Sequence, residues 1–432
     1  MNGTFVQGLD ENHESILLTE DAKAGENYRI ILGVYTGTHT FQTSLRSSIA
    51  ILDRATEKYY YDIVVPLEVA KLLDKEDKEY IEIVQSLNES LNLLDLRKPG
   101  SKQYYQSLEQ AQQYLDREFY EKRCGDQEAV VYCVGHTHID IAWLWTLEVA
   151  KDKAVRSFGT VIQLMKEYPE YIFMSSQPHL YKAIKEREPE LYDAIKQEIA
   201  AGRWEPEGGM FVEADCNLTS GESLVRQILY GKRFFQKEFQ KDNELLWLPD
   251  VFGYSAAMPQ ILQKSGIKYF MTTKISWNEF NKLPYDTFLW EGIDGSKVLT
   301  HFIPASDYDI NRVRQGHFTT YNGKLGPSQI KGAWQRYQQK YLNDEVLMAF
   351  GYGDGGGGPT KKMLEHQRRL SKGIPGAPKT IMATARDFFE VLESKVMNSK
   401  HLPEWSGELY LEYHRGTYTS MARNKKYNRK SE

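Results

Sequence analysis

Residues 129–140 read AVVYCVGHTHID, and this stretch decides the fold that we expect for the chain. Its first six residues form a continuous apolar run, which is typical of a strand buried on both faces in a parallel sheet. His136, His138 and Asp140 follow directly. Because parallel α/β folds carry their chemistry at the carboxyl ends of strands, we expect this strand to deliver polar side chains to a site.

Similar apolar runs alternate with helical stretches from residue 128 onward, which predicts an α/β fold with a mainly parallel sheet covered on both faces. Further strands are expected at 171–175, 245–248, 269–272, 298–303 and 346–350, and helices at 142–168, 178–201 and 220–239. At least six such units are present, enough to close into a barrel, although the count does not separate a barrel from an open sheet.

The first 65 residues read as β structure. Stretches rich in β-branched and aromatic residues at 28–36, 47–53 and 59–65 predict short strands. Helical spacing follows over 67–96 and 101–122, with a breaker at Pro99-Gly100 between the two helices.

Three regions are therefore expected. Residues 1–65 form a partial β-rich N-terminal domain, residues 66–127 form a helical linker, and residues 128–432 form the α/β catalytic domain.

The composition narrows the class of protein. The formal net charge of −5 implies no basic surface, which argues against nucleic acid or an anionic membrane as a partner. The three cysteines form no disulfide framework, and no signal sequence or membrane-length apolar run is visible. We expect a cytoplasmic protein. The aromatic share of 12% suits a carbohydrate site, although ordinary packing accounts for most of these residues.

Polar residues collect where the predicted strands end. These residues are Asp250, Asp307, Asp309, Asp354 and His414, with Asp215 in a loop before the helix at Ser220. His138 and Asp140 are two residues apart, so both side chains can point the same way from an extended segment. A histidine and a carboxylate that converge suit zinc or a related divalent ion. The simpler interpretation of His136 is a hydrogen-bonded core histidine.

The aspartates are also candidates for acid–base work. Glycoside hydrolysis needs a pair of carboxyl groups, and composition alone does not rank the five aspartates. A capping role fits Asp215 poorly, because Ser220 is the better N-cap for the following helix. The glycine run at 353–358 lacks the spacing of a phosphate loop, and it indicates positive φ angles or a close approach of the backbone.

Five segments taken together resemble glycoside hydrolase family 38, the α-mannosidases of the cytosolic and vacuolar type. They occur in family order over about two-thirds of the chain. The segments are GHTHIDIAWLW (135–145), EGGMFVEADCNLTSGESLVRQ (207–227), WLPDVFGYS (247–255), GYGDGGGGPT (351–360) and EYHRGTYTS (412–420).

The resemblance implies a (β/α)7-like barrel and one divalent metal ion, most often zinc, with cobalt and manganese also suited to the ligands. The implied metal ligands are His138, Asp140, Asp215 and His414. Asp215 is also the implied nucleophile of a retaining reaction that releases terminal mannose from α-mannoside oligosaccharides.

The resemblance further implies that Trp143 stacks on the sugar and that Asp250 lines the site. The acid/base aspartate follows a later strand in the family. Asp307 and Asp354 are the first candidates for that role, and Asp309 competes with them.

Family members are about twice as long as this chain, so we expect a truncated chain, and a homo-oligomer is possible. Two other functions stay open. One is a different metal-dependent sugar hydrolase such as a deacetylase, which would release acetate. The other is an inactive mannose-binding remnant, which would bind metal and sugar without turnover.

Overall fold

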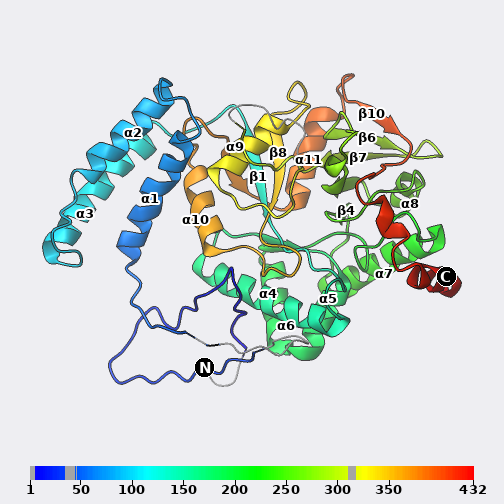
Figure 1. The fold of residues 1–432 in the computed structure, drawn as a ribbon, viewed down its shortest axis with the longest axis horizontal. Coiled ribbons are helices and arrows are strands. Elements are labelled where there is room, and N and C mark those ends of the chain that lie inside the picture. Colours follow the sequence, from blue (N-terminus) through cyan, green and yellow to red (C-terminus); the bar gives the residue numbers. More distant parts are fainter. Residues whose placement is uncertain (1–4, 35–43, 45, 310–317) are drawn as a thin grey trace.

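The computed structural model describes residues 5–34, 44, 46–309 and 318–432 (Figure 1). Its strands form two sheets in the centre of the molecule, with helices around them. The strands are β1 Val130–Gly135, β2 Phe173–Ser175, β3 Trp204–Pro206, β4 Leu245–Leu248, β5 Tyr269–Thr272, β6 Thr287–Glu291, β7 Lys297–Phe302, β8 Glu345–Phe350, β9 Lys379–Met382 and β10 Glu404–Ser406.

The first sheet has the order β3-β2-β1-β8, with β9 also paired to β1, and the second has the order β10-β6-β7-β5-β4. Every pair is parallel except β6 with β7. The predicted α/β class with mainly parallel strand pairing is therefore confirmed, and so is the buried strand expected from residue 129.

Two contacts bring the sheets together. Gly208, just beyond β3, forms a parallel bridge with Leu246 of β4. The ring Nε2 of His301 in β7 accepts a hydrogen bond of 3.5 Å from the backbone N–H of Leu347 in β8. The strand pairing itself gives two sheets, and the closed barrel stays a prediction.

The helices cover the sheets from several sides (Figure 1). The α-helices are α1 Arg54–Ala70, α2 Lys78–Leu91, α3 Lys102–Leu115, α4 Leu147–Glu167, α5 Pro178–Arg187, α6 Pro189–Ala200, α7 Gly221–Phe239, α8 Met258–Lys264, α9 Pro327–Arg336, α10 Lys361–Leu370, α11 Ala385–Val396 and α12 Ala422–Ser431. Shorter turns are the π-helix η1 Asp116–Glu121 and the 3-10 helices η2 Lys274–Trp277 and η3 Arg415–Tyr418.

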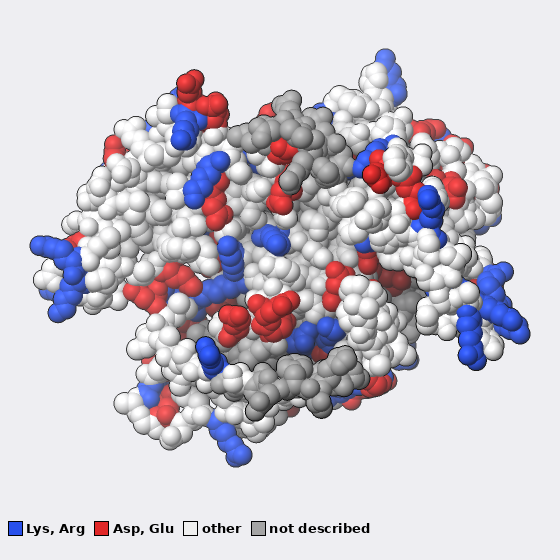
Figure 2. All heavy atoms as spheres, viewed as in Figure 1, with Lys and Arg blue, Asp and Glu red and all other residues white. Residues whose placement is uncertain are grey.

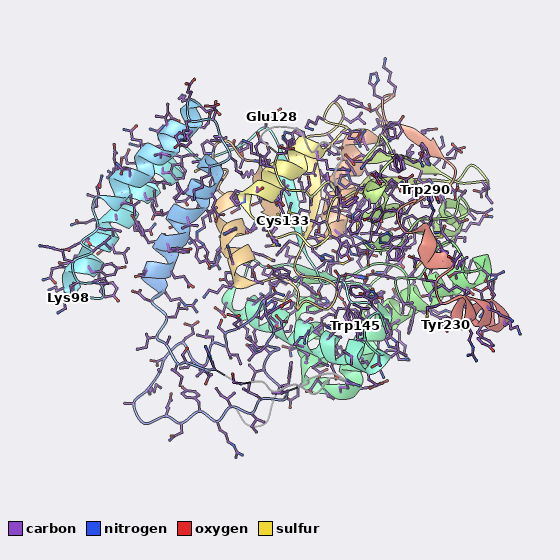
Figure 3. The ribbon with its side chains drawn as sticks, in the orientation of Figure 1. Lys98, Glu128, Cys133, Trp145, Tyr230 and Trp290 are labelled. Atoms are coloured by element: carbon purple, nitrogen blue, oxygen red, sulfur yellow. The ribbon has the colours of Figure 1, made fainter. Side chains whose placement is uncertain are left out.

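The core follows the two sheets. One cluster of buried side chains surrounds β1 and β8 and reaches α1, and a second lies around β4, β5 and β6. In Figure 3, Cys133 of β1 lies in the middle of the molecule, and Trp290 of β6 marks the second sheet. Acidic and basic side chains are intermixed on the face shown in Figure 2. None of the described helices is long and apolar enough to cross a membrane.

The predicted strand at 59–65 is wrong, because these residues lie inside helix α1. The side chain of Asp53 caps the helix by accepting a bond from Thr56 N–H. Tyr59, Ile63 and Pro66 then recur at helical spacing on the buried face. Burial of this face outweighs the strand propensity of the aromatic and β-branched residues.

The other two predicted N-terminal strands are also absent from the described residues 28–34 and 46–53. The end of the first prediction, residues 35–36, lies outside the described residues. A strand needs a neighbour for its backbone hydrogen bonds. The side chains of Ile49 and Ile51 are 89% and 99% exposed, so nothing in the described chain covers this stretch. The β-rich character predicted for residues 1–65 is not found here.

Some predicted helices are shorter or divided. The helix expected over 67–96 breaks at the Asp74–Asp77 turn between α1 and α2. The helix expected over 178–201 is split at Pro189, which has no N–H to continue it. The expected helix at 220–239 is confirmed, with Ser220 as its N-cap.

Helix α1, which runs across the predicted boundary at residue 65, packs on the rest of the molecule. Asp62 of α1 lies 2.7 Å from the guanidinium of Arg369 in α10, and both side chains are at least 95% buried. The boundary between linker and catalytic domain stays a prediction.

Helix α7 supports the loop that leads toward the site. A Cβ added at Gly231 would lie 2.2 Å from the carbonyl oxygen of Gly209 and 2.6 Å from the carbonyl carbon of Met210. We therefore expect Gly231→Ala to push this loop away from α7 and to cost about 1–3 kcal/mol of stability through overpacking. A thermal unfolding curve measures the loss as a lower Tm.

Gly221, in the first turn of the same helix, is the matched control. A Cβ there would have no neighbour within 4 Å, so Gly221→Ala should leave the Tm unchanged or slightly higher. Equal Tm values for the two variants would contradict the close packing of α7.

Candidate active site and metal centre

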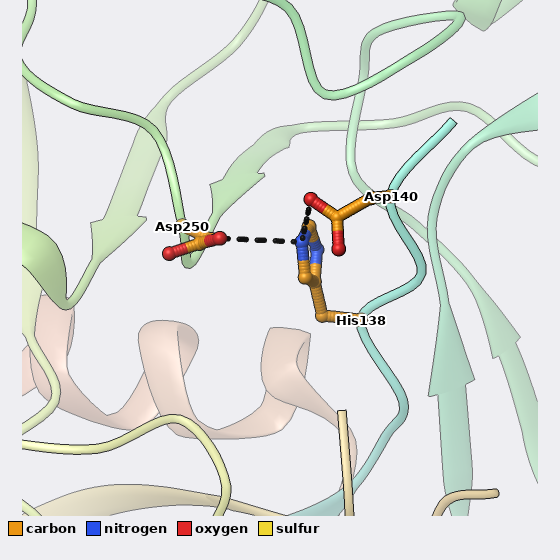
Figure 4. Close-up of side chains that lie close together, drawn as sticks. All are labelled: His138, Asp140 and Asp250. Atoms are coloured by element: carbon orange, nitrogen blue, oxygen red, sulfur yellow. Dashed lines mark ion pairs between the residues drawn. The ribbon is translucent and has the colours of Figure 1, made fainter. Parts of the chain in front are cut away.

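His138, Asp140 and Asp250 form a cluster at the carboxyl ends of β1 and β4 (Figure 4). Each offers one ligand atom, and these atoms all lie within 4.8 Å of one another. Nε2 of His138 is 3.5 Å from Oδ1 of Asp140 and 3.6 Å from Oδ2 of Asp250. The cluster is the one group of this kind in the part of the chain that the structure describes.

The opposite edge of the His138 ring, at Nδ1, faces Glu213. Nδ1 of His138 lies 2.7 Å from Oε2 of Glu213, and both side chains are about 95% buried. The second oxygen of Glu213 accepts a hydrogen bond of 2.7 Å from the Ser176 hydroxyl. With Nδ1 facing Glu213, the ring presents Nε2 to Asp140 and Asp250.

Gln177 joins the three segments behind this contact. Its side-chain oxygen accepts from the Glu213 N–H at 3.1 Å, and its Nε2 donates to the carbonyl oxygen of Ile139 at 3.0 Å. Gln177 is 3% exposed and has a φ of 63°, a left-handed conformation that a glutamine adopts only when its surroundings hold it. The ends of β1 and β2 and the loop after β3 are thereby tied together.

The cluster has a strongly negative potential. Burial alone would lower the pKa of His138, but the carboxylates of Glu213 and Asp140 outweigh it and raise this pKa well above its ordinary value. Burial raises the pKa of Asp250, and His138 and Lys274 partly offset that rise. The carboxylates that stabilise the positive charge of a protonated His138 would also stabilise a cation bound beside its ring.

The donor set fits a divalent metal ion. Nε2 of His138 and Oδ2 of Asp140 are buried, and neither atom has a hydrogen-bond partner among the described residues. Orphaned buried polar atoms are rare in folded proteins. One imidazole nitrogen and carboxylate oxygens are ligands that zinc and related ions accept.

His136 is placed differently from His138. Its Nε2 lies 2.6 Å from the carbonyl oxygen of Tyr321, its ring packs edge-on against Trp247, and burial lowers its pKa to about 4. The expectation of a hydrogen-bonded core histidine is confirmed.

Asp354 lies beside the cluster, after β8. Its two carboxylate oxygens accept hydrogen bonds from the Tyr321 hydroxyl at 2.9 Å and from Asn322 Nδ2 at 3.2 Å. The Tyr321 ring also packs edge-on against His138, with 5.5 Å between ring centroids. Asp354 further contributes to the raised pKa of Asp250, after burial.

Asp215 and His414 lie outside the group of atoms within 4.8 Å. The carboxylate of Asp215 accepts from the backbone N–H groups of Asn217 and Leu218, which makes it a turn residue in this structure. The His414 ring packs against Phe252, two residues beyond Asp250, with 4.6 Å between centroids. Burial and then the Lys274 ammonium lower the pKa of His414, which favours the neutral ring, the form that binds metals.

The segments that carry Asp215 and His414 are neighbours. Asn217 Nδ2 donates to the Tyr418 hydroxyl at 2.5 Å and to the Phe252 carbonyl oxygen at 3.2 Å. Cys216 forms a parallel bridge with Tyr254. Asp215 and His414 therefore lie on loops that flank the segment after Asp250.

The remaining predicted residues lie nearer the surface. Trp143 is 59% exposed and packs edge-on against Trp145, whose indole N–H donates to the Asp140 carbonyl oxygen. Asp307 is exposed, and its carboxylate accepts a 3.4 Å hydrogen bond from Ser328. The backbone N–H of Asp309 donates to Gln335.

The sequence did not predict two residues of this site, Glu213 and Lys274. Glu213 stands two positions before Asp215, and the spacing argument that paired His138 with Asp140 applies to it equally. Lys274 lies two residues beyond the end of β5, where a lysine by itself does not indicate a metal or acid–base site. Its ammonium lies 2.7 Å from Oδ1 of Asp250 and 3.4 Å from the centre of the Trp277 ring.

Comparison with known proteins gives the family. The sequence pattern of the glycosyl hydrolases family 38 N-terminal domain matches residues 128–408, which include His138, Asp140, Asp250 and Asp354. The chain belongs to this family.

Named relatives are similar over most of the chain. It is 37% identical to Alpha-mannosidase G of Dictyostelium discoideum over 99% of its length, 39% identical to human Alpha-mannosidase 2C1 over 91%, and 36% identical to Alpha-mannosidase of Saccharomyces cerevisiae over 90%. It spans 39%, 35% and 36% of these relatives, respectively. An α-mannosidase structure from Enterococcus faecalis V583 has a TM-score of 0.53 at 21% identity, over 65% of this chain and 31% of that one, and it supports the fold.

The contact between Glu213 and His138 gives a test of the metal centre. Partners that hold a metal-binding histidine typically contribute 10–100-fold to affinity. We expect Glu213→Ala to weaken zinc binding by about that factor, because the ring loses the group that fixes its orientation. Titration of the metal-free chain with zinc in a calorimeter measures the effect.

Two adjacent serines provide the control. Ser176→Ala removes a hydrogen bond to Glu213 and should weaken zinc binding slightly, whereas Ser175→Ala should not, since Ser175 donates to the Ser176 carbonyl oxygen instead. Unchanged affinity in Glu213→Ala would show that Glu213 does not support a metal site.

Proposed function

We propose that this chain carries the catalytic centre of a metal-dependent, retaining α-mannosidase. The observation that carries the proposal is the His138, Asp140 and Asp250 cluster inside the segment that matches family 38. Three relatives of similar sequence are named α-mannosidases. The substrate would be a terminal α-mannoside of an oligosaccharide.

His138 and Asp140, with Asp215 and His414 from the neighbouring loops, would hold one divalent ion. Zinc suits this set, and so do cobalt and manganese. When bound, the ion would supply Lewis acidity that polarises the hydroxyl groups of the sugar. The unpartnered nitrogen of His138 and the neutral ring of His414 support this assignment.

The protein's own groups would carry the two steps of the reaction. The Asp215 carboxylate attacks C1 of the mannose, the bond to the leaving oxygen breaks, and a carboxylic acid donates its proton to that oxygen. The resulting carboxylate then takes a proton from water, the water oxygen bonds to C1, and Asp215 is released. The configuration at C1 is retained after two inversions.

Asp354 is the better candidate for the acid/base group. It lies beside the cluster and is held by Tyr321 and Asn322, whereas Asp307 is exposed and bonded to Ser328. A group that transfers protons needs a fixed position near the leaving oxygen. Trp143 would offer an exposed aromatic face to the sugar, and Asp250, paired with Lys274, would line the site.

The proposal also covers the barrel architecture, the cellular location and the oligomeric state. We propose a (β/α)7-like barrel, supported by the bridge from Gly208 to Leu246 and the contact of His301 with Leu347. A cytoplasmic location rests on the cysteine usage, and a homo-oligomer remains an expectation from the family.

Metal removal is the first test. Treatment with a chelator should abolish hydrolysis of an aryl α-mannoside by this chain, and added zinc or cobalt should restore it. Metal analysis of the purified chain should give one ion per molecule. Full activity after complete metal removal would contradict the metal-dependent mechanism. Acetate release from an acetylated sugar, or sugar binding without turnover, would favour the two other functions.

Substitution of the nucleophile is the second test. Asp215→Asn should lower kcat for an aryl α-mannoside by at least about 10³-fold, because an amide cannot form the covalent intermediate. The exposed Glu222, in the first turn of α7, offers a control in Glu222→Gln, which should leave kcat unchanged. Full activity of Asp215→Asn would exclude it as the nucleophile.

A further inference from the structure

The N-terminal segment runs along helix α4 and ends on the glycine-rich loop after β8. We name residues 5–13 the N-terminal strap and residues 353–358 the glycine loop. The strap is fixed to α4 by two side chains: Gln163 Nε2 donates to the carbonyl oxygen of Val6 at 2.9 Å, and Thr160 Oγ1 donates to that of Gly8 at 3.3 Å. A Cβ added at Gly159 would meet the Phe5 ring at 2.2 Å, so the strap packs directly on the helix.

The end of the strap forms a turn that bonds to the glycine loop. Asp10 and His13 pair through their backbones, and the Asp10 carboxylate accepts from the Asn12 N–H at 2.9 Å. From this turn, Asn12 Nδ2 donates to the carbonyl oxygen of Gly356 at 3.1 Å. The ring of His13, which is 8% exposed, places Nε2 2.9 Å from the carbonyl oxygen of Pro359.

This contact explains why the loop needs glycines. A Cβ at Gly357, which has a φ of +95°, would lie 2.4 Å from the Asp10 carboxylate and 2.7 Å from the His13 ring. Gly355, with a φ of +75°, accepts a hydrogen bond of 2.8 Å from Arg156 of α4 at its carbonyl oxygen. Positive φ and the close approach of the strap both exclude larger residues here.

The opposite side of the glycine loop faces the cluster. The Gly355 N–H donates to the carbonyl oxygen of His138 at 3.3 Å, and the Gly353 N–H donates to Asn322 at 2.8 Å. Between them, Asp354 has a φ of +55°, an uncommon conformation for a residue other than glycine. A residue in such a conformation persists only where its surroundings hold it.

We propose that the N-terminal strap is a positioning element of the active site, which holds the glycine loop and thereby the carboxylate of Asp354. The strap lies more than one hundred residues before the segment that matches the family, residues 128–408. The catalytic part of the inference rests on the proposed function, with Asp354 as the acid/base group. The contact between strap and loop does not depend on it.

The test removes the two side chains that reach the loop. In this chain loaded with zinc, the double variant Asn12→Ala/His13→Ala should lower kcat by about 10–100-fold, the scale expected when a catalytic group is misplaced by about 1 Å. KM should change little. The loss should be larger for a mannoside with a poor leaving group than for an activated aryl mannoside, because a poor leaving group needs the acid more.

The matched control is Glu11→Ala/Glu14→Ala, which changes two exposed residues of the same turn. It should leave kcat unchanged for both substrates. A variant that was merely less stable would lose activity equally on the two substrates, and that outcome would overturn the positioning role.

A second measurement separates the strap from the chemistry. Amide hydrogen exchange, followed by mass spectrometry, should be faster at residues 351–360 in the Asn12→Ala/His13→Ala variant than in the control. Equal exchange in the two proteins would overturn the proposal. A parent chain without any mannoside turnover would overturn the proposed function, while the exchange rates would still decide whether the strap holds the loop.

Discussion

The parallel ladder between β1 and β8 sets the geometry on which the site depends. Residues 130–135 pair one for one with residues 345–350, so the two strands end at the same level. Gly135 stands at that end, where a Cβ would meet the Ile172 carbonyl oxygen at 2.7 Å. The loops that leave these strands must therefore be neighbours, and they carry His138 and Asp354. A register shift of one residue would turn the side chains of the shifted strand to the opposite face of the sheet.

Charge is the second constraint on this edge of the sheet. Several carboxylates converge on one buried imidazole, and such a group is costly without compensating positive charge. Lys274 compensates Asp250 from one side, with its ammonium against the Trp277 ring. Oδ1 of Asp140 faces Nε2 of His138, and its Oδ2 is buried without a hydrogen-bond partner among the described residues. The proposed metal ion would lie between these two unpartnered atoms, the nitrogen of His138 and the oxygen of Asp140.

Several strands of the α/β fold could be predicted from the sequence because they are continuous apolar runs, such as residues 245–248. The short or polar strands β3 and β9 carry no such signal. The strand predicted at residues 59–65 was wrong because these residues combine high strand propensity with helical spacing. Burial of one helical face against the core favours the helix. In the site, His138 and Asp140 follow from their spacing together with their place at the end of a predicted strand. The approach of Asp250 and Glu213 to His138 depends on tertiary structure, which no local pattern encodes.

The glycine run at 353–358 shows which features of a loop its own sequence can predict and which it cannot. Its composition indicates positive φ and a close neighbour, but the neighbour is a turn more than three hundred residues earlier in the chain. The backbone of Asp354 belongs to the loop that this turn contacts at Gly356, whereas its carboxylate accepts a hydrogen bond from the Tyr321 hydroxyl, so the two parts have different partners. An acid/base group needs a fixed backbone and a fixed carboxylate, because proton transfer depends on the distance to the leaving oxygen as much as on the pKa. If Asp354 is the acid/base group as proposed, the N-terminal segment belongs to the functional unit, although the family pattern begins only at residue 128.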